Sequence, residues 1–98
     1  MAYKVVIIPD AKQDIKEAAK WYNERQKNLG KRFINSISKE ITIIRNNPFL
    51  YEIRYQDVRI ALAEMFPYLI HFSIYNELIV IKAVYHTSRN SDLWLQKD

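Results

Sequence analysis

The sequence predicts an α+β fold in which a helical hairpin packs on one face of a small, mostly antiparallel sheet. Three observations support this: an apolar run near the start, two helix-period segments in the first half, and alternating apolar segments in the second half. The expected order is β-α-α-β-β-β. With 98 residues, 49% of them hydrophobic, we expect a single domain over residues 1–98.

Residues 3–8 are apolar and β-branched, which predicts a well-covered first strand. Pro9 and Asp10 then start a helix, with Asp10 as the expected N-cap and Gln13 at the capping-box distance. The apolar positions of this helix share one face, with Trp21 at its border; they are Ile15, Ala18, Ala19 and Tyr22. We expect the Trp21/Tyr22 pair to lie in the core.

The segment Asn28-Leu29-Gly30 holds the only glycine and marks the break between the first helix and a second one. Apolar residues of the second helix recur every three or four positions: Leu29, Phe33, Ile37, Ile41 and Ile44. Pro48 ends this helix, because proline cannot continue a helix and disfavours helical conformation at Asn47. The short connection predicts that the two helices form an antiparallel hairpin.

From residue 51 the pattern alternates, which predicts strands over residues 58–65, 68–75 and 78–86, with Asn76-Glu77 as a hairpin turn. If Tyr75 faces Leu78, one face is apolar and receives the helices. That face consists of Tyr68, Ile70, Phe72, Ile74, Ile79, Ile81, Ala83 and Tyr85. The other face is mixed and consists of Leu69, His71, Ser73, Tyr75, Val80, Lys82, Val84 and His86, with His71 expected to be partly exposed.

Composition excludes several classes of protein. There is no cysteine, so there is no disulfide framework and no thiol nucleophile, and with two histidines at no ligand spacing we expect neither a metal nor a cofactor. No signal peptide precedes the first strand, and no apolar stretch approaches the roughly 20 residues of a membrane span, so the expected compartment is the cytoplasm. The net charge of +4 suits a nucleic acid or an acidic protein, and equally an ordinary basic protein.

Short motifs in a fixed order carry a family resemblance over roughly residues 3–94. They are Ala18 to Tyr22 followed by Leu29-Gly30-Lys31-Arg32-Phe33, then Asn47-Pro48, Val58-Arg59, Phe66-Pro67-Tyr68 and the tail His86-x-x-Arg89-x-x-x-x-Trp94. Together they resemble the RelE/ParE superfamily of bacterial toxins from type II toxin–antitoxin systems. The tail is similar to the ParE-like branch, except that Ser91 stands where that branch usually has a proline.

The resemblance implies a small toxin that is neutralised by a cognate antitoxin. RelE-like members cut mRNA on the ribosome without a metal, whereas ParE-like members poison DNA gyrase and are not known to be nucleases. As a nuclease, the chain would use His86 for proton transfer and Arg59 and Arg89 to hold phosphate. The strands from residue 58 to 85 carry only Arg59, His71 and Lys82 as basic groups, which is sparse for gripping RNA and favours a protein target.

The ParE-like hypothesis therefore assigns a set of target-binding residues: Arg59, Tyr85, His86, Arg89 and Trp94. The antitoxin is expected to contact the mixed face at His71, Tyr75 and Lys82, because sheet surfaces and edges accept added segments and a +4 protein attracts an acidic chain. Simpler roles remain open, such as a strand-end hydrogen bond for His86 and a hydrophobic plug for Trp94. A third hypothesis is an interaction module that retains the fold without toxicity.

Overall fold

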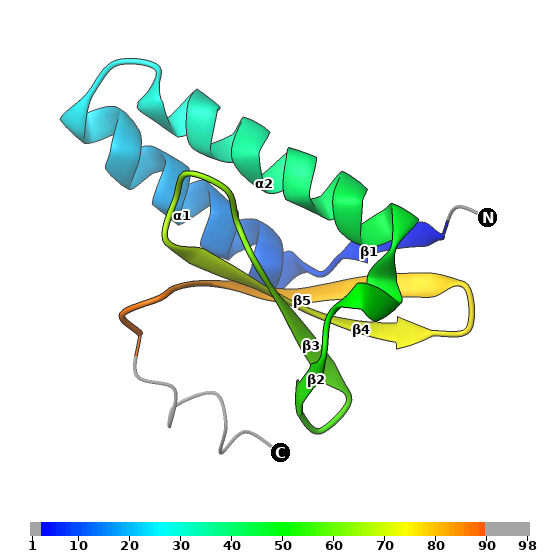
Figure 1. The fold of residues 1–98 in the computed structure, drawn as a ribbon. Helices are drawn as coiled ribbons and strands as arrows, with labels where there is room; N and C mark the ends of the chain where they lie inside the picture. Colours follow the sequence, from blue (N-terminus) through cyan, green and yellow to red (C-terminus); the bar gives the residue numbers. More distant parts are fainter. Residues whose placement is uncertain (1–2, 90–98) are drawn as a thin grey trace.

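A computed structural model of the chain describes residues 3–89. Its elements are β1 (Lys4–Ile7), α1 (Pro9–Arg25), α2 (Leu29–Asn46), a short 3-10 helix η1 (Pro48–Leu50), β2 (Ile53–Tyr55), β3 (Val58–Leu62), β4 (Tyr68–Tyr75) and β5 (Leu78–His86). The strands form one sheet in the order β1-β5-β4-β3-β2, in which β1 is parallel to β5 and the other neighbours are antiparallel. Both helices lie on the same face of this sheet (Figure 1).

The predicted α+β architecture is confirmed, with two differences in the strands. The three-residue strand β2 is an addition, and β3 ends at Leu62 rather than at residue 65, since Met65 has a positive φ of 74° in the following turn. Neither helix within residues 3–89 is long and apolar enough to cross a membrane.

Helix α1 begins two residues earlier than the capping pattern suggested. Its N-cap is Ile8, so the prediction of Asp10 as the N-cap is wrong. Pro9 occupies the first helical position, where its fixed φ fits the helix and its missing N–H is not needed. Asp10 instead lies in the first turn, where its charge is favourable toward the positive end of the helix dipole.

The helical hairpin closes by direct contact between its two helices. The Asn23 side chain accepts a hydrogen bond of 2.7 Å from the Gly30 backbone N–H. A Cβ atom at Gly30 would lie 2.3 Å from the Ala19 carbonyl oxygen, so only glycine fits at this crossing. Asn28 turns the chain with a φ of 67°, a conformation that asparagine tolerates better than most residues. Gly30 is the second residue of α2, so the break between the helices lies before it, at residues 26–28, and the role of the glycine is to let the helices pack closely.

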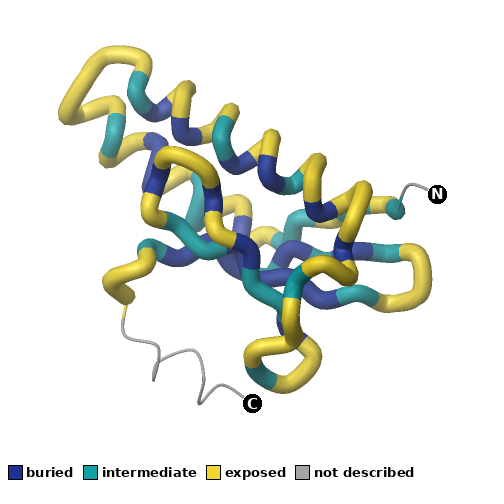
Figure 2. Tube along the Cα trace, viewed as in Figure 1, coloured by how far each residue is buried: buried dark blue, intermediate teal, exposed yellow. Residues whose placement is uncertain are grey.

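The core lies between the helical hairpin and the inner face of the sheet (Figure 2). Its largest fully buried apolar side chains come from α2 and the two central strands: Phe33, Ile37, Ile44, Ile70, Phe72, Ile79 and Ile81. Tyr22 joins this core, with its ring centroid 5.0 Å from that of Phe66. Trp21 does not; its side chain is 47% exposed, so its predicted place in the core is wrong. Its position at the border of the apolar stripe turns it toward solvent.

The β4–β5 hairpin follows the predicted register only as far as a bulge. Tyr75 pairs with Leu78 and Phe72 with Ile81, as expected, but His71 pairs with Ala83. Lys82 is therefore the extra residue of a β-bulge, which reverses the two faces of β5 beyond it.

The bulge contradicts the predicted faces of four residues. Val84 belongs to the core under the helices, whereas Ala83 and Tyr85 lie in a second cluster on the outer face, with Tyr55 and Ile60 packed against them. His86 pairs with Tyr68 on the inner face. A straight register would have buried Ala83 and left Val84 outside. The bulge thus places the larger apolar side chain in the core.

Candidate functional site

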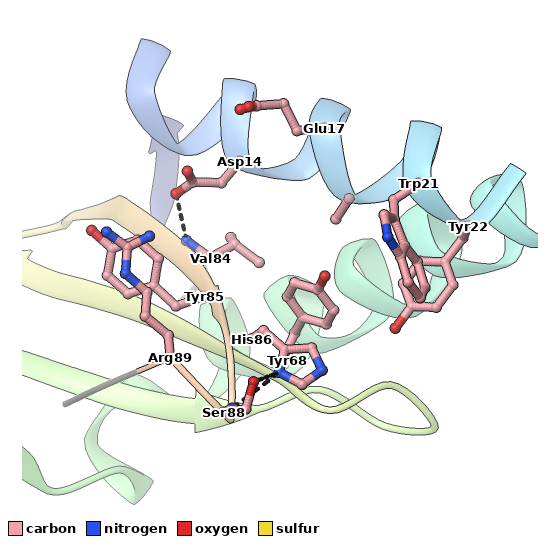
Figure 3. Close-up of a pocket in the computed structure, with 11 residues that line it drawn as sticks. Asp14, Glu17, Trp21, Tyr22, Tyr68, Val84, Tyr85, His86, Ser88 and Arg89 are labelled. Atoms are coloured by element: carbon pink, nitrogen blue, oxygen red, sulfur yellow. Dashed lines mark hydrogen bonds between the residues drawn. The ribbon is translucent and has the colours of Figure 1, made fainter. Parts of the chain in front are cut away.

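A pocket of about 440 Å³ lies between α1 and the end of β5. Strand β1 stops at Ile7, the partner of Ile81, so β5 continues without a neighbouring strand on that side. The pocket fills this space and is lined by α1, Tyr68 and the chain from Val84 to Arg89 (Figure 3). It gathers three of the predicted target-binding residues, namely Tyr85, His86 and Arg89.

Asp14 of α1 takes over the role of the missing strand. Its Oδ2 accepts a 3.0 Å hydrogen bond from the Val84 backbone N–H, as drawn in Figure 3. Burial raises the pKa of the Asp14 carboxyl, and the charges of Glu17 and Asp10 act in the same direction; the Val84 hydrogen bond and the Arg89 guanidinium oppose the increase. Asp14 therefore fixes the end of β5 to α1 at an electrostatic cost.

The imidazole of His86 is held by its own strand end. Its Nδ1 accepts hydrogen bonds from the Ser88 backbone N–H at 3.0 Å and from the Ser88 hydroxyl at 2.7 Å. A backbone N–H can only donate, so Nδ1 carries no proton and the neutral ring has its proton on Nε2. In this arrangement His86 can donate a hydrogen bond through Nε2, while its Nδ1 is occupied by Ser88. The ring also lies against Tyr68, with centroids 5.2 Å apart.

Arg89 extends this surface beyond the strand. Its guanidinium carbon lies 4.0 Å from the centroid of the Tyr85 ring, a cation–π contact, and its backbone N–H donates to the His86 carbonyl. The Thr87 N–H donates to Pro67, which attaches the segment after β5 to the start of β4. Tyr85, His86 and Arg89 therefore lie at the end of β5, where the buried Tyr85 ring supports the exposed Arg89 guanidinium. We call these three residues the strand-end surface.

Arg59 does not join the strand-end surface. Its Nη1 donates a 2.6 Å hydrogen bond to the Tyr51 carbonyl, and its guanidinium carbon lies 5.0 Å from the Phe49 ring. It is not among the residues that line the pocket. Arg59 therefore holds the segment that includes η1 against β3, and the three residues proposed for a nuclease are not brought together. Trp94, the remaining predicted residue, lies outside the residues that the structure describes.

The expected antitoxin-binding residues occupy different environments on the outer face. His71 is fully buried at 0% exposure, so the prediction that it is partly exposed is wrong. Its ring lies under those of Tyr55 and Tyr85, with centroids 5.7 Å and 5.0 Å away, and its Nδ1 is 2.9 Å from the Tyr55 hydroxyl. The bulge explains this burial, because it brings Tyr85 to the face that holds His71.

Tyr75 and Lys82 lie together at the other end of this face. The Lys82 ammonium is 5.5 Å from the Tyr75 ring centroid and 3.5 Å from Asp57. Burial would raise the pKa of Asp57, but hydrogen bonds from Ser73 and Tyr75 and the nearby Lys82 outweigh it, so the pKa is lowered. Tyr75 and Lys82 are thus within reach of a partner, whereas His71 could affect one only through the residues above it.

Sequence reasoning overlooked Asp14, Tyr68 and Ser88, although Asp14 left a signal. It lies three residues after Ala11 and four before Ala18, both buried, so a carboxylate interrupts the apolar stripe of α1. Such a residue needs a hydrogen-bond partner, and Val84 supplies one. Within residues 3–89, no group of three or more His, Asp or Glu side chains is placed to hold a metal ion.

Comparison with known proteins identifies the family. Residues 5–91 match the family described as the ParE toxin of type II toxin-antitoxin system, parDE. The chain belongs to this ParE toxin family. Among solved structures, a chain of the chromosomal ParDE TA system from P. aeruginosa matches with a TM-score of 0.79 and 12% identity, over 89% of this chain and 98% of that chain. At this identity the match shows a shared fold. Comparison with curated proteins gave no match.

Family membership confirms the resemblance read from the motifs, including its assignment to the ParE-like branch. The protein is a ParE-type toxin of a toxin–antitoxin system. In this ParE-type chain, the strand-end surface carries part of the tail motif, and Asp14 and Pro67 hold that surface to the rest of the fold.

Proposed function

We propose that this chain inhibits growth in the cytoplasm by acting on DNA gyrase, and that a cognate antitoxin neutralises it. The match of residues 5–91 to the ParE toxin family carries the proposal. The geometry supports a protein target, because the strand-end surface presents the exposed Arg89 guanidinium against the buried Tyr85 ring, with the half-buried His86 imidazole beside them. Aromatic and arginine side chains of this kind contribute much of the binding energy at protein interfaces.

The alternative of a ribosome-dependent endoribonuclease is less well supported by the same geometry. Such an enzyme needs a base for the 2′-hydroxyl and cations at the same phosphate. Here Nδ1 of His86 is occupied by Ser88, and Arg59 is held by Tyr51 away from the pocket. Two of the three proposed catalytic groups are thus committed to other contacts.

Induced expression in cells distinguishes the two targets when mRNA ends and gyrase-linked DNA breaks are mapped in the same culture. We expect gyrase-linked breaks with intact mRNA from the native chain and neither signal from an Arg89→Ala variant. Codon-phased mRNA cuts without DNA breaks would overturn the gyrase proposal. Unchanged growth together with retained antitoxin binding would favour an interaction module that has lost toxicity.

The antitoxin is proposed to be an acidic chain that contacts the outer face of the sheet near Tyr75 and Lys82. Tyr75 is exposed, and Lys82 supplies a positive charge beside it. The product of the gene beside this one is the natural candidate, and its affinity for the purified toxin is the measurement. A neighbouring product that shows no binding would contradict this part of the proposal.

A further inference from the structure

The positive charge of this chain is concentrated in one place. Residues 20–32 carry five basic side chains and one acidic one, whereas the other 85 residues carry ten of each. The whole formal net charge of +4 therefore resides in this short segment. The segment comprises the end of α1, the loop and the first turn of α2, and we call it the hairpin tip. Its basic residues are Lys20, Arg25, Lys27, Lys31 and Arg32.

The hairpin tip projects from the molecule. Figure 1 shows the α1–α2 loop at the end of the hairpin that extends past the sheet, and Figure 2 shows the loop and the helix ends beside it largely as exposed. All five basic residues of the tip are exposed. None of them forms an ion pair with a carboxylate of residues 3–89; the ion pairs there join Lys39 to Glu64 and Lys82 to Asp57. The positive potential of the tip is therefore directed to solvent.

Contacts between the two helices also support the backbone of the tip. The Asn23–Gly30 hydrogen bond and the close approach of Gly30 to Ala19 lock the two helices together. Within the loop, the Leu29 N–H donates to the Gln26 carbonyl. A partner therefore meets cations on a preorganised backbone rather than on a loop that must be ordered first.

The positions of two of these basic residues do not stabilise the helix. Lys31 and Arg32 lie in the first turn of α2, and that turn contains no acidic residue. The positive end of the helix dipole disfavours cations at this position. Their placement therefore works against the helix and calls for another role.

The chemistry of the tip fits phosphates better than a protein surface. A protein interface normally has an apolar centre. The only large exposed apolar side chain of the tip is Trp21, and the Arg25 guanidinium covers one face of its ring at 3.6 Å. A phosphodiester backbone requires only cations, which release its counterions on contact.

We propose that the hairpin tip binds the phosphate backbone of duplex DNA. The choice of duplex DNA rests on the proposed function, because DNA is the substrate of gyrase. The toxin would then hold the DNA through the hairpin tip while the strand-end surface contacts the protein target.

The test measures binding of the purified chain to a fluorescein-labelled 30-base-pair duplex by fluorescence anisotropy over a salt series. The tip variant carries Lys27→Glu, Lys31→Glu and Arg32→Glu. A matched control carries Lys12→Glu, Lys16→Glu and Arg45→Glu, three exposed changes outside the tip that alter the net charge equally. We expect the tip variant to lose at least about tenfold in affinity, and its salt slope to fall by about three, whereas the control changes the slope by less than about one.

Equal losses in the two variants would overturn the proposal, because net charge alone would then explain binding. Tighter binding to single-stranded RNA of the same length, or equal competition by polyglutamate, would overturn the choice of duplex DNA. Circular dichroism, and a second tip variant with Lys27→Gln, Lys31→Gln and Arg32→Gln, exclude misfolding as the cause of a loss of DNA affinity. Native chain that binds DNA yet produces no gyrase-linked breaks would contradict the gyrase proposal and leave the DNA contact standing.

Discussion

At the scale of single residues, Asp14 shows how this fold manages the point where β1 ends. Its carboxylate bonds the Val84 N–H, which would otherwise lack a strand partner. The helix thereby satisfies the backbone of the strand that carries the strand-end surface. Because burial raises the pKa of Asp14, folding favours the protonated carboxyl, and the ionised form costs stability.

This gives a prediction for the variant Asp14→Asn, which keeps a carbonyl to accept the Val84 hydrogen bond and cannot ionise. In the native chain, the raised pKa of Asp14 adds to the free energy of unfolding in full below about pH 4. This stabilisation is lost as the pH rises through the raised pKa. The stability of Asp14→Asn relative to the native chain should therefore increase between about pH 4 and pH 7. Urea unfolding at several pH values measures the difference.

An Asp14→Ala variant provides the control, because it removes the acceptor at every pH. It should be less stable than Asp14→Asn by about 1 kcal/mol throughout the series. If the native chain instead gains stability over Asp14→Asn as the pH rises, the carboxylate is stabilising and this account of Asp14 is wrong.

At the scale of elements, the helical hairpin depends on the close approach of its two helices at Gly30. A Cβ there would lie 2.3 Å from the Ala19 carbonyl oxygen and 2.6 Å from the Asn23 side chain. Gly30→Ala should therefore push the helices apart and lower the free energy of unfolding by about 1–3 kcal/mol, although alanine is the better helix former. Thermal or urea unfolding measures this loss.

Ser38→Ala is the matched control for Gly30→Ala, because Ser38 is an exposed residue of the same helix. It should change stability by less than about 0.5 kcal/mol. Equal effects of the two substitutions would show that the hairpin tolerates a side chain at residue 30.

Periodicity correctly predicted the elements whose sequence signals lie within the element itself. Both helices and the β4–β5 turn follow from apolar spacing, Pro48 and Asn76, and all of them are found in the structure, although the break between the helices lies just before Gly30. The bulge at Lys82 was not predictable in the same way. It depends on whether Ala83 or Val84 packs better under the helices, which is decided between elements far apart in sequence.

The residues of the candidate site also differ in whether the sequence could predict their positions. Tyr85, His86 and Arg89 are close in sequence, so their meeting at one strand end was predictable. The separation of Arg59 from them was not, because it follows from the contacts of Arg59 with Tyr51 and Phe49 across the sheet edge. Asp14 shows the opposite case, in which an interrupted apolar stripe pointed to a site residue that the motif comparison passed over.

At the scale of the whole molecule, Arg89 and Arg59 were predicted to act together, but we expect substitution of Arg89 to affect toxicity and substitution of Arg59 to affect stability. Arg89 is exposed, so Arg89→Ala should change stability by less than about 0.5 kcal/mol and yet abolish growth inhibition. Arg59→Ala removes a charged donor from the Tyr51 carbonyl and should cost about 1–3 kcal/mol. Colony counts after induced expression and urea unfolding of the purified variants measure the two effects.

Two further variants make this comparison decisive. Arg54→Ala, at an exposed arginine of β2, should leave growth inhibition intact, so that loss of an arginine alone does not explain the Arg89 result. Arg59→Gln keeps an N–H donor for the Tyr51 carbonyl, and the folded protein should remain toxic because Arg59 lies outside the strand-end surface. A stable Arg59→Gln protein that no longer inhibits growth would instead place Arg59 in contact with the target, and the functional surface would then extend across the sheet to β3.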